Sequence, residues 1–217
     1  MAQRRSILIV GGGTAGWLAA CLFAKKLGGC DITLIESPEI GIVGVGEATF
    51  PTIRTTLKTI GLDEATFLRE CHGTYKQGIL FPDWRVKGET YFHPFDPPFY
   101  NREAIDLVPY WLLQNPAERL PFAEAVSFQK QVADAHRAPK WRHDKDFEGP
   151  LNHAFHFDTA RFGVLLSRHA KAMGVRHLSG NMRAVRLSGR WRHRGRRHGR
   201  IRRTDGGFFH RLHGFPL

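Results

Sequence analysis

The chain has 217 residues, of which 42% are hydrophobic and 24% charged, and its formal net charge is +12. This composition is ordinary for a globular protein, and no apolar run approaches the roughly 20 residues of a membrane-spanning helix. Residues 1–5 lead straight into the first predicted strand, which leaves no room for a signal peptide. We therefore expect neither a membrane anchor nor secretion.

The three cysteines, Cys21, Cys30 and Cys71, are odd in number and lack the spacing of a metal site. The twelve histidines lack metal spacing as well, and four of them lie in the last 30 residues. We expect reduced thiols in a cytoplasmic protein, and no metal.

The positive charge is concentrated in residues 188–217, which contain nine arginines and one acidic residue. This tail carries +8 of the +12, so the preceding 187 residues carry only +4. The tail has neither a helical nor a strand period, and we expect it to be disordered and to add nothing to the fold. Its arginines would allow salt-sensitive, sequence-independent nucleic-acid binding, but it contains no recognisable reading module, so we expect no specific nucleic-acid partner.

A glycine-rich turn follows the first strand, Ser6-Ile7-Leu8-Ile9-Val10, and leads into a helix. This strand–turn–helix order is the context in which a G-x-G-x-x-G pattern indicates dinucleotide binding. Gly11 permits the tight turn, Gly13 lets a pyrophosphate approach the backbone, and Gly16 lets helix and strand pack closely. The first helical N–H groups and the positive end of the helix dipole would face the phosphates, which makes Thr14 and Ala15 further cofactor-binding candidates.

An acidic residue, Glu36, follows Gly16 by twenty residues and ends a second strand-like run, Ile32-Thr33-Leu34-Ile35. A carboxylate in this place accepts hydrogen bonds from the ribose of a dinucleotide. Strand, glycines, helix and acid together predict a dinucleotide-binding region.

The other elements of the first 71 residues follow from local signals. The helix over residues 14–27 is stopped by Gly28-Gly29 and has Ala15, Leu18, Ala19 and Leu22 on one face. A second glycine cluster occupies residues 41–49. Pro51 begins a helix that Gly61 ends, and Asp63 caps a short helix that reaches Cys71.

The rest of the chain is less regular. Residues 75–81 and 89–92 are predicted to be strands, and short helices are expected near residues 108–114 and 121–128. Asp158 caps a helix to residue 173, which Gly174 ends, and whose apolar stripe is Phe162, Leu165, Leu166, His169 and Met173. Two more strands are expected over residues 175–178 and 182–187.

Several motifs together resemble the flavin-dependent tryptophan halogenases. They are Gly-Gly-Gly-Thr-Ala-Gly-Trp at 11–17, Thr-Leu-Ile-Glu-Ser at 33–37, Gly-Val-Gly-Glu-Ala-Thr at 44–49, Tyr-Lys-Gln-Gly at 75–78, His93-Pro94-Phe95 and Ala-Phe-His-Phe-Asp at 154–158. The resemblance covers about residues 5–187. It implies an α/β fold, a glutathione-reductase-like FAD-binding Rossmann region, incomplete here and interleaved with the beginning of a substrate domain. We therefore divide the chain into residues 1–187 and the tail 188–217.

The resemblance also implies the chemistry. In the family, FAD is supplied reduced by a separate flavin reductase, and with oxygen and chloride or bromide it gives hypohalous acid. This oxidant halogenates tryptophan or another indole in a second pocket. Lys76 matches the lysine that receives the oxidant, and His93 and Phe95 match residues that line the indole pocket. Gly46, Glu47 and Thr49 belong to a strap between the two regions and are candidates for flavin contact, whereas His156 and Asp158 shape the entry to a helix.

Other elements of the family pattern are absent from this sequence. It has no Trp-x-Trp-x-Ile-Pro element, no matching partner glutamate and no Ser-Thr-Gly halide segment. Codons can be chosen for residues 210–216 that, read one nucleotide later, encode Ile-Asp-Cys-Thr-Gly-Phe, a family motif expected here. We therefore expect a frameshifted tail and a catalytically incomplete chain.

Two alternatives stay open at the level of the sequence. One is a different FAD-dependent monooxygenase, against which Lys76 and the Glu-Ala-Thr strap argue. The other is a fragment that binds flavin without catalysis, which flavin retention without turnover would reveal.

Overall fold

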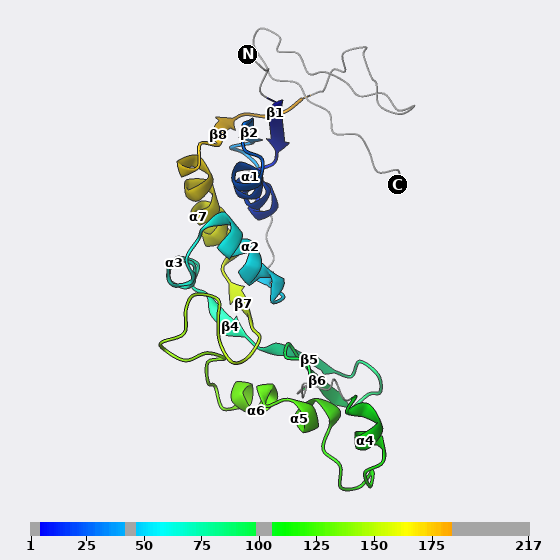
Figure 1. Cartoon of the computed structure of the whole chain (residues 1–217). Helices are drawn as coiled ribbons and strands as arrows, with labels where there is room; N and C mark the ends of the chain where they lie inside the picture. Colours follow the sequence, from blue (N-terminus) through cyan, green and yellow to red (C-terminus); the bar gives the residue numbers. More distant parts are fainter. Residues whose placement is uncertain (1–4, 42–46, 99–105, 184–217) are drawn as a thin grey trace, which may run out of the picture. The chain divides into compact units, whose positions relative to one another are not determined.

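The computed structural model describes residues 5–41, 47–98 and 106–183 (Figure 1). The described residues of Met1–Val43 and Leu166–Leu217 form one compact unit, and those of Gly44–Leu165 form a second. The predicted tail, the predicted strand residues 184–187 and Gly46 lie outside the described residues. Met182, at the start of that predicted strand, belongs to no strand.

The first unit contains a parallel sheet of three strands, which confirms the predicted α/β class. Its strands are β1 (Arg5–Val10), β2 (Cys30–Glu36) and β8 (Arg176–Ser179), in the order β1-β2-β8. Ile7 lies opposite Ile32, and Ile35 opposite Leu178. Four successive residues of β2, from Ile32 to Ile35, are buried, as expected for a central parallel strand.

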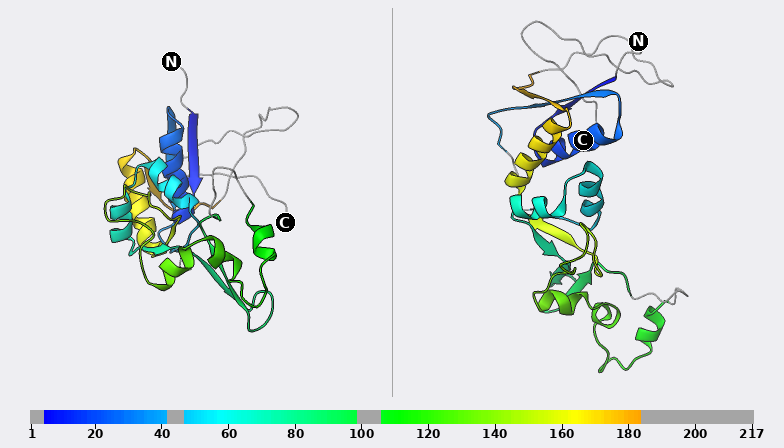
Figure 2. Two further views of the ribbon diagram at one scale, coloured as in Figure 1. Left: turned by 60° about the horizontal axis from the view of Figure 1, so that its bottom comes forward. Right: turned by 60° about the vertical axis from the view of Figure 1, so that its left-hand side comes forward.

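Helix α1 (Thr14–Lys26) packs beside this sheet (Figures 1 and 2) with a face that differs from the prediction. The buried residues are Trp17, Ala20 and Cys21, whereas Ala15 is exposed. Apolar residues occur all around this helix, so its periodicity could not identify the inner face. The side of α1 that carries Trp17 faces the sheet, where the Trp17 ring centroid lies 5.2 Å from that of His177 on β8.

The second unit is built on an antiparallel sheet whose central strand was not predicted. Strand β7 (Ala154–Phe157) pairs on one side with β3 (Glu47–Ala48) and on the other with β4 (Thr74–Lys76). The sequence alone predicts for His156 and Asp158 only a role at the entry to a helix. The sequence Ala-Phe-His-Phe offers only four residues of alternation, the shortest run over which a period of two indicates a strand.

The predicted strand over residues 75–81 is in fact two strands that pair with different partners. After β4, the strand β5 (Gly78–Pro82) forms a hairpin with β6 (Thr90–Pro94), which replaces the predicted strand 89–92. The change of partner falls at Gln77, whose side chain donates a hydrogen bond to the Arg137 carbonyl at 2.7 Å. Gly78 is required beside it, since a Cβ there would lie 2.6 Å from the His93 carbonyl oxygen.

The helices of the second unit largely begin and end where local signals placed them. Gly61 ends α2 (Thr52–Ile60) with a φ of 80°, and Asp63 caps α3 (Glu64–Glu70). Short helices α4 (Val108–Leu112) and α5 (Phe122–Val126) match the two predicted ones, whereas α6 (Gln129–Asp134) was not predicted. None of the described helices is long and apolar enough to cross a membrane.

Helix α7 (Thr159–Ala172) confirms the helix predicted after Asp158. The Asp158 carboxylate accepts from the Arg161 N–H at 3.0 Å, and Gly174 beyond the helix has a φ of 89°. Of the predicted stripe, Phe162, Leu165 and Leu166 are buried.

An aromatic cluster forms the core of the second unit. The fully buried ring of Phe67 on α3 makes edge contacts with Phe155, Phe157 and Phe162, at centroid separations of 5.0, 5.2 and 5.4 Å. Edge-to-face packing suits the charge distribution of aromatic rings. The cluster fixes α3 against β7 and the first half of α7.

Replacement of the Asp63 cap should loosen α3. The Asp63 carboxylate accepts from the Thr66 N–H at 2.7 Å, and this hydrogen bond lowers the pKa of Asp63. We expect Asp63→Ala to cost about 1 kcal/mol, measured as roughly fivefold faster hydrogen exchange of the α3 amides.

The pH dependence has a defined sign. The pKa of Asp63 is lower in the folded chain than in the unfolded chain. The stabilisation from the Asp63 charge is therefore fully present above the pKa of the unfolded chain, and it is lost as the pH falls through the pKa of the folded chain. Asp63→Asn keeps an acceptor and should retain most protection without this pH dependence. Equal exchange in Asp63→Ala and the unchanged chain would contradict the role of the cap.

Candidate functional site

Two glycines of the predicted G-x-G-x-x-G pattern, Gly11 and Gly16, are needed for structural reasons. Gly11 has a φ of 110° and donates its N–H to the Ile35 carbonyl at 2.9 Å. A Cβ on Gly16 would lie 1.9 Å from the Gly11 carbonyl oxygen. Gly11 therefore supplies a backbone conformation that other residues rarely adopt, and Gly16 allows α1 to approach the turn.

Gly13 is different, because no described residue requires glycine at this position. Its φ of −67° and ψ of 175° are open to any residue, and a Cβ would meet no atom within 4 Å. As the N-cap of α1 it has no side chain to accept from the helix, and the first turn carries no acidic residue. The N–H groups at the start of α1, where Thr14 and Ala15 lie, are thus available to an anion.

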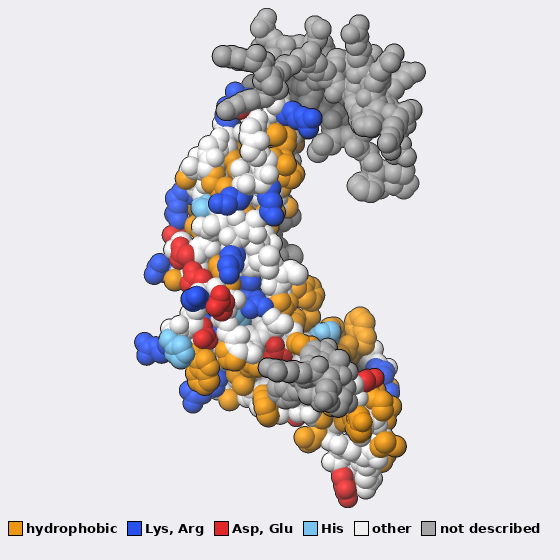
Figure 3. Space-filling model, in the orientation of Figure 1, with side chains coloured by type: hydrophobic (Ala, Val, Ile, Leu, Met, Phe, Trp, Pro, Cys, Tyr) orange, Lys and Arg blue, Asp and Glu red, His pale blue; other side chains and the backbone are white. Residues whose placement is uncertain are grey.

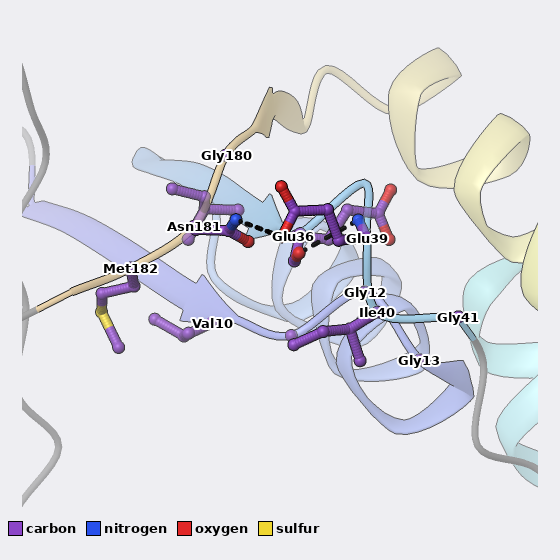
Figure 4. Close-up of a pocket in the computed structure, with 13 residues that line it drawn as sticks. Val10, Gly12, Gly13, Glu36, Glu39, Ile40, Gly41, Gly180, Asn181 and Met182 are labelled. Carbon is purple, nitrogen blue, oxygen red and sulfur yellow. Dashed lines mark hydrogen bonds between the residues drawn. The ribbon is translucent and has the colours of Figure 1, made fainter.

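A pocket of about 480 Å³ lies at the carboxyl ends of β1, β2 and β8 (Figure 4). It brings together three predicted residues, Gly11, Gly13 and Glu36, and is also lined by Gly180, Asn181 and Met182, which the sequence did not indicate. Their position after a parallel strand was the available signal, since ligands bind at that edge of such sheets.

Glu36 reaches into this pocket with both carboxylate oxygens already in contact with protein atoms. Its Oε1 lies 2.8 Å from Nε2 of His177. Its Oε2 lies over Gly12, where a Cβ would be 1.4 Å away. The pattern did not single out Gly12, which the Glu36 side chain requires to be glycine. Ribose binding by Glu36 stays a prediction.

Lys76 lies on β4 in the second unit, opposite Ala154 of β7. The residue is only 8% exposed, and its Nζ lies 5.2 and 5.4 Å from the ring centroids of Phe50 and Phe95. Burial lowers the pKa of the Lys76 amine. Within the part of the chain that the structure describes, no carboxylate pairs with Nζ. The nearby His156 has its pKa lowered by burial and by the Lys76 charge.

The predicted substrate residues His93 and Phe95 line one cavity of about 880 Å³. His93 belongs to β6 and Phe95 follows it, and residues of α5 line the cavity as well. Hydrophobic side chains gather over the part of this unit that carries β5, β6 and α4 (Figure 3). Phe95 lines this cavity, and its ring also contacts Lys76 Nζ.

The backbone of Phe95 is fixed by hydrogen bonds with two side chains, Gln129 and Asn152, which the sequence did not indicate. The Gln129 side chain, fully buried at the start of α6, accepts through Oε1 from the N–H groups of Phe95 and Asp96, the latter at 2.7 Å. Asn152 donates through Nδ2 to the Phe95 carbonyl at 3.2 Å. Gln and Asn carry no motif, and the contacts span 34 and 57 residues, so no local signal could have found them.

A buried charge cluster connects residues 140–153 to α3. The Glu64 carboxylate is contacted by Lys140 Nζ at 2.5 Å, by the Phe147 N–H at 2.9 Å and by His153 Nε2 at 3.4 Å. Burial alone would raise the pKa of Glu64, but these partners outweigh it and leave the pKa below its ordinary value.

The strap residues are described only in part. The Thr49 hydroxyl donates to the Phe155 carbonyl at 2.9 Å and accepts from the Phe155 N–H at 3.1 Å. The backbone of Glu47 pairs with Phe157 in the sheet. Flavin contacts by Gly46, Glu47 and Thr49 stay predictions, and Thr49 has a structural role besides. Among the described residues, no group of histidine, cysteine and acidic side chains could hold a metal ion.

Comparison with known proteins gives consistent results. The tryptophan halogenase family profile matches residues 6–195. A tryptophan 7-halogenase of Lentzea aerocolonigenes is 36% identical over 82% of this chain and 36% of its own length, and a tryptophan 6-halogenase of Streptomyces toxytricini is 32% identical over 85% and 39%. The crystal structure of a tryptophan halogenase from Shewanella frigidimarina superposes with a TM-score of 0.76 at 36% identity, over 87% of this chain and 38% of that one. This chain thus spans well under half the length of each.

Removal of the Thr49 hydroxyl should weaken the second unit. Thr49→Val keeps the shape but leaves the Phe155 N–H without its acceptor, which should cost about 1–2 kcal/mol. Urea unfolding of the 217-residue chain would measure this loss. Thr49→Ser keeps the hydroxyl and serves as the matched control. If the valine variant were as stable as the serine variant, the hydroxyl would not hold the strap to β7.

Proposed function

The chain belongs to the tryptophan halogenase family, and from this premise we propose that it carries part of the flavin site and the oxidant-handling lysine of a flavin-dependent halogenase. The proposed substrates are tryptophan or another indole together with chloride or bromide. The proposed cofactor is FAD, delivered reduced by a separate flavin reductase. Because the chain spans between 36% and 39% of the length of the two curated relatives, the activity of a whole enzyme is part of the proposal.

The residues of the first unit fit the adenosine and pyrophosphate half of FAD. Gly13 leaves open space beside the start of α1, where N–H groups can receive phosphate oxygens. Glu36 lies in the adjoining pocket at the end of β2. When bound and reduced, FAD supplies the electrons with which oxygen and a halide give hypohalous acid.

The burial of Lys76 is the observation that carries the proposal. A neutral amine can take the chlorine of hypochlorous acid and release water, and an ammonium can instead donate a hydrogen bond that orients the acid. Burial lowers the pKa of Lys76 and so favours the neutral form relative to an exposed lysine. Both routes need an amine held beside the bound indole.

The cavity lined by His93 and Phe95 is the proposed indole site. An aromatic ring such as Phe95 can hold an indole by stacking, worth about 0.5–1.5 kcal/mol beyond the buried area. Phe95 is also the residue that connects this cavity with Lys76.

A cytoplasmic location also stays a proposal. In the described residues, Cys21, Cys30 and Cys71 form no disulfide, and burial raises the pKa of the Cys21 thiol to about 11. A thiol with such a pKa is a poor nucleophile, which agrees with a structural rather than a redox role for Cys21.

Gly13→Ala tests the flavin site. The added methyl meets no atom of the described residues, so the cost to the free chain should be limited to that of alanine in place of glycine at the N-cap of α1, up to about 1 kcal/mol. The methyl would fill the space through which a pyrophosphate approaches, and ADP binding should weaken at least about tenfold in equilibrium dialysis.

Gly28→Ala is the matched control, because its Cβ also meets nothing within 4 Å and Gly28 does not line the pocket. Equal ADP affinity of Gly13→Ala and the unchanged chain would contradict the proposed phosphate site.

Lys76→Ala tests the lysine. We would join residues 6–183 to the remainder of the Lentzea relative and measure chlorotryptophan with FAD, a reductase, NADH and chloride. Loss of the amine should lower the rate at least about 100-fold while FAD binding persists. Lys58→Ala, at an exposed lysine, is the control. Undiminished chlorination by Lys76→Ala would refute the role of Lys76, and a folded, FAD-binding chimera without any chlorination would favour the non-catalytic alternative.

A further inference from the structure

We propose that Phe50 and Phe95 form an aromatic clamp over the Lys76 amine, and that Phe50 is a positioning residue which keeps water from this amine. The clamp is defined here as the neighbouring rings of Phe50 and Phe95, which both contact Lys76 Nζ. Its chemical meaning rests on the proposed function, whereas its existence can be tested on the chain alone.

The geometry places Nζ almost equally far from two rings. The distances to the ring centroids are 5.2 Å for Phe50 and 5.4 Å for Phe95, and the two centroids lie 6.0 Å apart with the planes inclined by 52°. Both distances are within the range of a cation–π contact. The rings therefore occupy space in which an exposed ammonium would hold its water.

Exposure distinguishes the roles of the two rings. Phe50 is 59% exposed, whereas Lys76 in contact with it is 8% exposed. Phe95 has its backbone held by Gln129 and Asn152 and lines the His93 cavity. Phe95 is thus the fixed inner wall, and Phe50 is the outer cover. Because Phe50 is largely exposed, its replacement removes the cover without opening the core.

Two effects of the rings on the amine oppose each other. The ring faces attract an ammonium, by about 0.5–1 kcal/mol each at exposed sites. Exclusion of water disfavours the ammonium, and among the described residues no carboxylate pairs with Nζ to compensate. The titratable side chain of His156 on β7 lies nearby, but burial and the Lys76 charge lower its pKa, so His156 is uncharged where Lys76 titrates. We infer that exclusion of water dominates.

The consequence concerns the form in which Lys76 meets an oxidant. A clamp that excludes water enlarges the neutral fraction of the amine near neutral pH. It also limits the directions from which a small molecule can reach Nζ. In the reaction proposed above, Phe50 would act through Lys76 without itself touching the reacting atoms.

The test is a titration of Lys76 in the 217-residue chain carrying ¹³C-labelled lysine. The Lys76 Cε signal is assigned by its loss in Lys76→Arg, and its shift is followed with pH. Phe50→Ala should move the midpoint upward by at least about 0.5 pH unit, because water regains access to the amine. Phe50→Tyr keeps a ring and should leave the midpoint near that of the unchanged chain.

Trp84→Ala is the control for loss of an exposed aromatic ring elsewhere, since Trp84 is 72% exposed and contacts Phe81. It should not move the Lys76 midpoint. If Phe50→Ala does not fold, Phe50→Leu should give a smaller shift in the same direction. An unchanged or lowered midpoint in Phe50→Ala, or in Phe50→Leu where the alanine variant does not fold, would overturn the clamp.

The titration needs neither flavin nor halide, so its result is independent of the ADP experiment with Gly13→Ala. If Phe50→Ala raises the midpoint but the unchanged chain does not bind ADP, the clamp stands and the proposed function is refuted. If the midpoint does not move but the unchanged chain binds ADP, the clamp is refuted and the proposed function stands.

Discussion

The second unit depends on the pairing of one four-residue strand, β7, with strands on both of its sides. Its neighbours β3 and β4 carry the strap and Lys76, which lie far from β7 in the sequence. Where β3 ends at Ala48, the Thr49 hydroxyl bonds both polar groups of the Phe155 backbone and continues the connection. Buried backbone N–H and C=O groups need hydrogen-bond partners. Because β7 provides them for both β3 and β4, the strap and Lys76 are fixed to the same strand.

Two buried ionisable groups of this unit are treated in opposite ways. Glu64 accepts hydrogen bonds from Lys140 and the Phe147 N–H and lies 3.4 Å from His153 Nε2, and its pKa stays below the ordinary value. Lys76 has aromatic rings as neighbours and burial as the cause of its lowered pKa. Buried charges with a structural role usually have partners of opposite charge or hydrogen-bond donors. Catalytic groups more often lack such partners and have perturbed pKa values. This contrast supports a chemical role for Lys76 and a structural role for Glu64.

The glycine turn of the first unit shows that one pattern can combine several physical reasons. Gly11 is required by its positive φ, Gly16 by close packing and Gly12 by the Glu36 side chain. Gly13 is required by none of these, and its open surroundings are consistent with space kept for a ligand. Because the described part of the protein does not explain why residue 13 is glycine, this glycine is the most informative one about function.

Local signals were sufficient to predict β1, α1 and β2, the caps Asp63 and Asp158, the helix-ending Gly61 and Gly174, and the family, because each depends on residues close together in the chain. The tertiary structure alone decided the inner face of α1, the partner change at Gln77, strand β7, and the placement of Phe95 by Gln129 and Asn152. Gln77 meets Arg137 across 60 residues, and Thr49 meets Phe155 across 106. No periodicity or spacing encodes such pairs, because they form only when buried polar groups and rings from distant segments compete for the same interior.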